Sequence, residues 1–128
     1  MSIHTDPSTY YPFYTGYADE TGEGDGAGFN LNIPLPRSTT DDAWLDAVAQ
    51  GLARIRDFAP GALMLSLGLD VHEDDPLKGM QVSWDGLRRA GAMIAAADLP
   101  TVLVQEGGYL SEGLTTSLVQ FLSGFMER

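Results

Sequence analysis

The 128-residue chain contains no cysteine, so it can form neither disulfides nor thiolate metal sites. It has no run of about eighteen apolar residues, which argues against a transmembrane helix. Its first residues show no basic segment followed by an apolar one, so no secretory signal is visible. Basic residues are scarce, since 7 Lys and Arg stand against 18 Asp and Glu, a net charge of −11. This balance disfavours nucleic acid as a partner and suits a cationic substrate, although a solvated surface is the simpler interpretation. We expect a cytoplasmic protein with no membrane partner.

The pattern of apolar residues predicts a single α/β domain over residues 1–128. The length and the 44% hydrophobic content are sufficient for one core. Apolar residues spaced three and four apart predict three helices, over 42–58, about 83–97, and from about 111 onward. Continuous apolar runs at 62–69 and 101–104 predict strands covered on both faces, and the segment 62–104 is then a right-handed βαβ unit with parallel strands.

The remaining local signals are weaker. Residues 2–4 and 29–35 are candidates for short strands, and the prolines in the second mark it as an edge strand. Thr39 is predicted to cap the helix 42–58, and Ser83 the next helix. Alternating glycines from Gly22 to Gly28 suggest a nucleotide-binding loop, which requires a helix directly after it. The following segment, 30–34, cannot begin a helix, so a structural loop is the preferred interpretation.

Two polar side chains follow the two predicted buried strands. Asp70 ends the run 62–69, and Tyr109 comes after Gly107 and Gly108, just past the second run. Because parallel strands end at the same edge of a sheet, both side chains are expected there. Asp70 is either a metal ligand or a cap for the following loop. Tyr109 either donates a hydrogen bond to a developing oxyanion or packs over the sheet edge with its hydroxyl in water.

The two histidines and Asp75 are interpreted structurally. His72 lies two residues beyond Asp70 and is predicted to be a loop residue near the rim of the site rather than a ligand. His4 is predicted to be a buried structural histidine. Asp75 begins a turn in which its carboxylate bonds backbone amides. Nothing in the sequence orients Glu106 as an acid or base.

Taken in order, these motifs resemble the histone deacetylase superfamily, and most closely its bacterial branch of acetylpolyamine amidohydrolases and histone-deacetylase-like amidohydrolases. The resemblance covers essentially the whole chain. It implies a three-layer α/β/α fold with a mainly parallel sheet, of the arginase/deacetylase kind. The segments that carry it are Ser2-Ile3-His4-Thr5-Asp6-Pro7, Tyr11-Pro12, residues 30–36, Ser66-Leu67-Gly68-Leu69-Asp70, Asp75-Pro76-Leu77 and Glu106-Gly107-Gly108-Tyr109.

The resemblance also implies a chemistry, the zinc-dependent hydrolysis of an N-acetyl amide on acetylated lysine or an acetylpolyamine. It makes Asp70 a zinc ligand and Tyr109 the group that polarises the amide carbonyl and stabilises the oxyanion. The substrate tunnel is expected to be lined by Tyr11, Pro76, Leu77, Gly107 and Gly108. Structural potassium ions are expected at Ser2, Ile3 and Phe29.

Residues 1–128 contain no tandem histidines, and Asp70-Val71-His72 is their one Asp-x-His sequence. They therefore depart from the family at its tandem-histidine motif and at its separate, upstream Asp-x-His segment. These motifs supply the general base and two further zinc ligands. The resemblance therefore identifies the C-terminal part of a catalytic domain, which is expected to be inactive by itself. An uncovered sheet edge and face favour a homo-oligomer or a complementary chain. The alternative is a non-catalytic interaction module that complements an N-terminal fragment.

Overall fold

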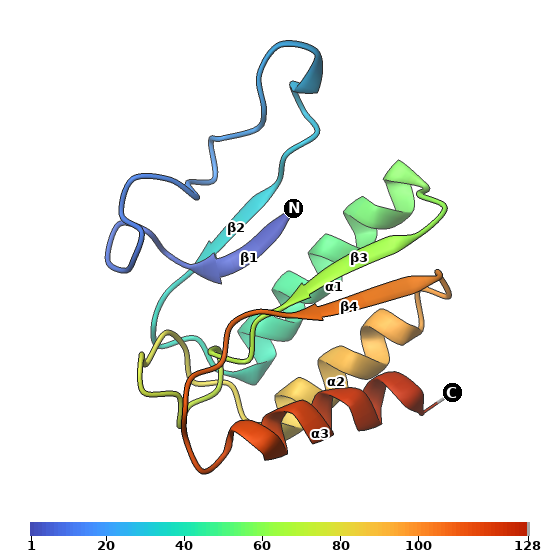
Figure 1. Cartoon of the computed structure of the whole chain (residues 1–128). Coiled ribbons are helices and arrows are strands. Elements are labelled where there is room, and N and C mark those ends of the chain that lie inside the picture. Colours follow the sequence, from blue (N-terminus) through green and yellow to red (C-terminus); the bar gives the residue numbers. More distant parts are fainter. Residues whose placement is uncertain (128) are drawn as a thin grey trace.

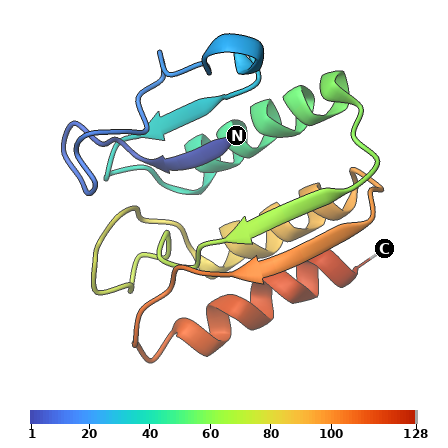
Figure 2. The same ribbon diagram turned by 45° about the horizontal axis from the view of Figure 1, so that its top comes forward.

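Two pairs of parallel strands form the sheet layer of this computed structural model, which describes residues 1–127. β1 (Ser2–Thr5) pairs with β2 (Asn32–Leu35), and β3 (Leu63–Leu67) pairs with β4 (Thr101–Gln105). In both views the four strands point the same way, and β1 and β3 are the inner strands of the two pairs (Figures 1 and 2). The carboxyl ends of all four strands therefore lie at one edge of the layer.

Helices occupy the predicted segments. They are α1 (Asp41–Phe58), α2 (Trp84–Ala95) and α3 (Leu114–Met126), with one 3₁₀ turn, η1, at Gly24–Gly26. α2 packs against both α1 and α3. The predicted α/β class with parallel strands is confirmed, and β3, α2 and β4 form the predicted βαβ unit. Within residues 1–127, no helix has the length and apolar character needed to cross a bilayer.

The two predicted helix caps have different outcomes. Ser83 caps α2, because its side chain accepts a hydrogen bond from the Gly86 amide at 3.2 Å. The prediction of Thr39 as the cap of α1 was wrong, since the N-cap is Thr40 and makes no side-chain cap bond. Thr39 is instead buried. The first helical residue, Asp41, turns its carboxylate to Ser83, whose amide and hydroxyl donate at 2.7 and 2.5 Å, so the two helix starts are tied together.

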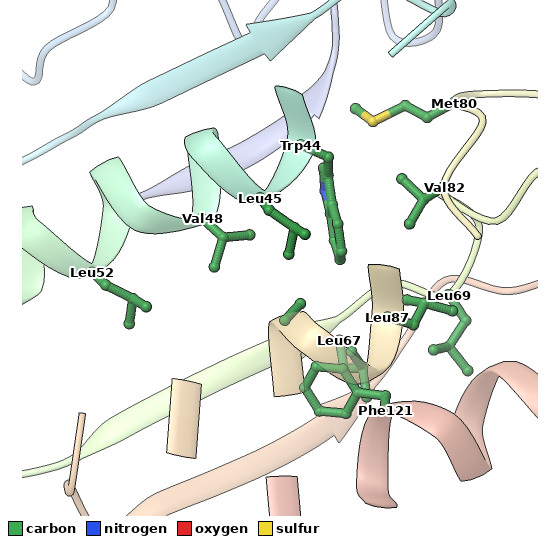
Figure 3. Close-up of a cluster of buried hydrophobic side chains, with 11 residues drawn as sticks. Trp44, Leu45, Val48, Leu52, Leu67, Leu69, Met80, Val82, Leu87 and Phe121 are labelled. Carbon is green, nitrogen blue, oxygen red and sulfur yellow. The ribbon is translucent and has the colours of Figure 1, made fainter. Parts of the chain in front are cut away.

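One hydrophobic cluster holds the three helices against the strands. Figure 3 shows it between α1, the loop before α2, and the end of β3. Its buried members include Trp44, Val48 and Leu52 of α1, Leu67 of β3, Leu87 of α2 and Phe121 of α3. The strand residues that pack on this cluster are Leu65, Leu67 and Leu103, so it covers one face of β3 and β4.

The opposite face of β3 and β4 is uncovered in the described chain. Met64, Val102 and Val104 point to this face and are 77%, 58% and 46% exposed. The continuous apolar run at 62–69 predicted a strand covered on both faces, and only the face carrying Leu65 and Leu67 meets the helices. The exposed face was expected from the resemblance to part of a larger domain.

Candidate active site at the carboxyl edge of the sheet

The loops that follow β3 and β4 meet at the carboxyl edge of the sheet. The Glu106 amide donates to the Leu67 carbonyl at 3.1 Å, and the Leu69 amide donates to the Gly107 carbonyl at 3.0 Å. These bonds extend the pairing of the two strands beyond their ends. As a result the loops that carry Asp70 and Tyr109 are adjacent at this edge, as the sequence predicts: the Asp70 carboxylate lies beside Gly107, and the Tyr109 amide bonds Asp75.

Asp75 joins the two loops. Its carboxylate is buried, at 3% exposure. One oxygen, Oδ1, accepts the Leu77 amide at 2.9 Å, as the predicted turn requires, and the other, Oδ2, accepts the Tyr109 amide at 3.0 Å. The second bond spans 34 residues and fixes the backbone at Tyr109 relative to the loop that carries Leu77. The sequence predicted the first bond but gave no sign of the second.

The Asp70 carboxylate lies in a cradle made by two glycines. A Cβ atom at Gly107 would stand 2.5 Å from Asp70 Oδ1, and one at Gly68 would stand 2.8 Å from it. Burial raises the pKa of Asp70, and the nearby carboxylates of Glu106 and Asp75 raise it further, against a lowering by its own backbone amide. The carboxylate is thus held in a partly desolvated, electronegative position, which favours binding of a cation.

Tyr10 is a site residue that sequence reasoning missed. Its hydroxyl donates to the Leu77 carbonyl at 3.3 Å, and the Arg37 guanidinium lies 5.2 Å from its ring centre. Burial, followed by the charges of Asp70 and Asp75, raises the pKa of its phenol. Its neighbour Tyr11, the predicted wall residue, is 73% exposed. The aromatic segment was visible in the sequence, but which of the two rings turns inward depends on contacts with the 75–79 loop.

The other predicted tunnel residues surround the same edge. Pro76 and Leu77 are exposed on the loop fixed by Asp75, and Gly107 is buried against Asp70. Gly108 has a φ of 117°, in the region that favours glycine, and a Cβ there would meet Leu69 and Leu114. Tyr109 is 47% exposed. Their role in a tunnel stays a prediction.

The residues predicted for potassium lie near the start of β1 and in the loop before β2. The Ser2 hydroxyl bonds His4 Nδ1 at 2.7 Å, and His4 Nε2 bonds the Gly16 carbonyl at 2.8 Å. His4 is thus part-buried and structural, in line with its interpretation. Phe29 packs edge-to-face on Phe58, with 6.1 Å between ring centres. The potassium role of Ser2, Ile3 and Phe29 is untested by these contacts.

His72 lies in the loop after β3, as predicted, but it is buried instead of standing at an open rim. Its ring is only 4% exposed and stacks on Trp84, with 5.2 Å between ring centres and an angle of 14° between planes. Its Nδ1 faces the Asp74 amide at 3.1 Å. The residue lies in a short bridge to Val82, which draws the loop under the start of α2. Within residues 1–127 it belongs to no group of three potential metal ligands.

The described residues do not complete a zinc site. Zinc in a catalytic site takes about three protein ligands. Among residues 1–127, no three His, Asp or Glu side chains come together in a way that could hold a metal ion. Asp70 is a suitable oxygen ligand in a favourable position, and the remaining ligands of any zinc ion would come from outside this part of the chain.

A carboxylate and a phenol meet at the carboxyl edge of a parallel α/β sheet, which is where proteins of this architecture commonly bind their ligands. The model of the histone deacetylase domain matches residues 1–125. The chain therefore belongs to the histone deacetylase family. The predicted deacetylase-like fold is confirmed by the same comparison and by the solved structures below.

Several relatives are bacterial acetylpolyamine amidohydrolases. The protein of that name from Burkholderia pseudomallei is 46% identical over 98% of this chain, and acetylpolyamine amidohydrolase 1 of Pseudomonas aeruginosa is 41% identical over 97%. The crystal structure of an acetylpolyamine aminohydrolase from Burkholderia pseudomallei superposes with a TM-score of 0.94 over 98% of this chain. That of a histone deacetylase homologue from Aquifex aeolicus superposes with a TM-score of 0.86 over 96%, at 32% identity. Residues 1–128 span only 34–37% of these four chains.

Proposed function

We propose that residues 1–128 form one part of a deacetylase that hydrolyses the N-acetyl amide of a cationic amine, with an acetylpolyamine as the preferred substrate class and acetylated lysine as the second. The observation that carries this proposal is that the buried Asp75 carboxylate, in the loop that follows Asp70, accepts the Tyr109 amide and so ties the two loops together at one sheet edge. The similarity to acetylpolyamine amidohydrolases supports the substrate class.

In this proposal Tyr109 acts on the substrate carbonyl. Its backbone is fixed by Asp75 while its side chain stays half exposed. A phenol held in this way can donate a hydrogen bond to the oxyanion that develops when the amide is attacked, and removal of such a donor typically costs a factor of 10²–10³ in rate. Tyr11, Pro76, Leu77, Gly107 and Gly108 would line the approach of the acetylated side chain.

The charge of the chain suits a cationic amine. The net charge of −11 attracts cations over a long range. Near the site, the exposed ring of Tyr11 offers a face over which an ammonium group can bind. Asp70 is proposed as one ligand of a zinc ion, which supplies Lewis-acid chemistry when bound. Potassium at Ser2, Ile3 and Phe29 and a cytoplasmic location complete the proposal.

Residues 1–128 alone are proposed to be inactive. They lack the family's tandem histidines, and a general base is typically worth a factor of 10²–10⁴. The same observation, with the lack of a three-ligand group in residues 1–127, favours a second candidate function. In it the chain is a non-catalytic module that binds a partner without taking part in hydrolysis.

Acetate release from an N-acetylated diamine separates these two functions. The chain is co-expressed with the segment of the Burkholderia pseudomallei relative that lies outside the matched stretch, and the complex is assayed. The proposal predicts hydrolysis by the complex and at least about a hundredfold loss with Tyr109→Phe. Tyr14→Phe is the control, because Tyr14 is 77% exposed. A purified complex without hydrolysis, or one unaffected by Tyr109→Phe, would support the non-catalytic module.

A further inference from the structure

Arg37, two residues beyond the end of β2, reaches across to the loop 75–79. Its Nε donates to the Lys78 carbonyl at 3.1 Å, and its Nη2 donates to the Leu77 carbonyl at 3.5 Å. These contacts span 41 and 40 residues of sequence. The loop that Arg37 contacts carries Pro76 and Leu77, which are proposed to line the approach of the substrate, whereas Arg37 itself has no part in the chemistry proposed above.

The backbone of Leu77 is held on both sides. Its amide donates to the buried Asp75 carboxylate at 2.9 Å. Its carbonyl accepts the Tyr10 hydroxyl at 3.3 Å as well as the Arg37 guanidinium. The residue is nevertheless 44% exposed. Leu77 is therefore fixed by hydrogen bonds to its peptide groups and only in part by the packing of its side chain.

Lys78 depends on the same support. Its φ of 51° lies in the left-handed region, which a residue with a side chain adopts at a cost in energy and keeps only where its surroundings hold it there. Its amide donates to the Asp75 carbonyl at 3.1 Å, and its ammonium donates to the Glu73 carbonyl at 2.7 Å. Both of these bonds lie within the segment 73–78, whereas the bond from Arg37 to the Lys78 carbonyl comes from outside it.

Arg37 also contacts the ring of Tyr10, the other residue that bonds the Leu77 carbonyl. The guanidinium carbon lies 5.2 Å from the centre of that ring. A guanidinium is planar and carries several donors in a fixed arrangement, so it can bond two neighbouring carbonyls while it packs on an aromatic ring. A lysine ammonium in its place keeps the charge but offers no such planar arrangement of donors.

We propose that Arg37 is a positioning residue for the deacetylation proposed above, and the inference rests on that function. Arg37 fixes the loop 75–79 so that Pro76 and Leu77 form a ready-made wall for the acetylated amine. It does not act on the amide carbonyl, because the backbone of Tyr109 is held separately by Asp75. Without Arg37 the substrate itself has to order the loop, and this cost falls on binding rather than on the chemical step.

The direction of the change in KM separates this role from two simpler ones. A cationic amine is repelled by an arginine, so if Arg37 acted only through its charge, its removal would lower KM. If Arg37 were only structural, its removal would lower the folded fraction, and with it the apparent kcat, without changing KM. Loss of loop positioning instead raises KM and leaves kcat nearly unchanged.

Acetate release from an N-acetylated diamine tests the inference in the chain co-expressed with the unmatched segment of the Burkholderia pseudomallei relative. Arg37→Gln should raise KM by at least about tenfold and change kcat by less than about threefold. Arg37→Lys should give an intermediate KM, because it restores the charge but not the planar donors. Arg56→Gln is the matched control. It removes the same charge from an exposed position in the last turn of α1, near the start of β3, and should not raise KM.

Amide hydrogen exchange measured by NMR provides a second readout that does not depend on catalysis. In Arg37→Gln the amides of Leu77 and Lys78 should exchange at least about fivefold faster than in the unsubstituted chain, while the Tyr109 amide, bonded to Asp75, should be unaffected. Active variants with an unchanged or lowered KM for Arg37→Gln, or with unchanged exchange at both loop amides, would overturn the inference and leave the proposed function standing. An unsubstituted complex without hydrolysis would overturn the proposed function and this inference with it.

Discussion

The substitution Asp75→Asn tests how the site is held together. Asp75 uses both carboxylate oxygens, one for the Leu77 amide at 2.9 Å and one for the Tyr109 amide at 3.0 Å. An asparagine has a single side-chain oxygen, so its NH₂ group must face one of these N–H donors and at least one bond is lost. A hydrogen bond to a charged group contributes about 1.5–3 kcal/mol, and an amide left buried without a partner adds to the cost.

We therefore expect Asp75→Asn to lower the free energy of unfolding by about 2–4 kcal/mol. With a urea dependence of about 2 kcal/mol per molar, the middle of the usual range, the midpoint of urea unfolding should fall by about 1–2 M. Asp74→Asn is the matched control, because Asp74 is exposed and its contact with His72 is made by its backbone amide. The Tyr109 amide should also exchange faster in Asp75→Asn. Equal urea midpoints for the two variants would refute the reasoning.

Three further substitutions have directions fixed by the structure. Gly124→Ala would drive a Cβ into the Arg88 carbonyl of α2 and should lower the free energy of unfolding by about 1–3 kcal/mol, whereas Gly61→Ala, in open space, should change little; urea unfolding measures both. Because the pKa of Asp70 is raised in the folded protein, the ionised carboxylate destabilises the fold when the pH is above this raised pKa. Below the ordinary pKa of 3.8 the carboxyl group is protonated in both the folded and the unfolded chain, and the effect is absent. Asp70→Asn should therefore raise the Tm at about pH 7 and no longer raise it at about pH 3. The pKa of Glu20 is lowered from its ordinary 4.5, chiefly because its carboxylate accepts the Gly16 amide, so the ionised carboxylate stabilises the fold. Glu20→Gln should therefore lower the Tm when the pH is above 4.5 and leave it unchanged when the pH is below the lowered pKa. Equal pH profiles for these two variants would contradict both assignments.

Local patterns were sufficient to predict most of the fold. The βαβ unit and the position of Asp70 and Tyr109 at one edge follow from two apolar runs that end in polar residues. Each run can be identified as a strand from its own residues, and the two strands pair in parallel as predicted. The helix cap at Ser83 could also be predicted, because a capping side chain bonds a backbone amide only three residues further along, here that of Gly86. The family motifs then supplied roles for these residues that periodicity alone left open.

Features that depend on contacts between residues far apart in the sequence could not be predicted from local patterns. Thr39 looked like a cap, but Asp41 is drawn to Ser83, 42 residues away, and the start of α1 shifts. His72 was expected in a loop near the rim of the site, and stacking on Trp84 buries it.

Zinc content of the purified protein tests most directly whether this chain supplies one part of a metal site. The account predicts less than stoichiometric zinc in residues 1–128 alone, since the described residues bring no three ligands together. It predicts one zinc per complex with the complementary segment of the Burkholderia pseudomallei relative, and loss of that zinc with Asp70→Ala but not with the exposed Asp74→Ala. Stoichiometric zinc in the isolated chain, or full retention of zinc in the Asp70→Ala complex, would contradict it.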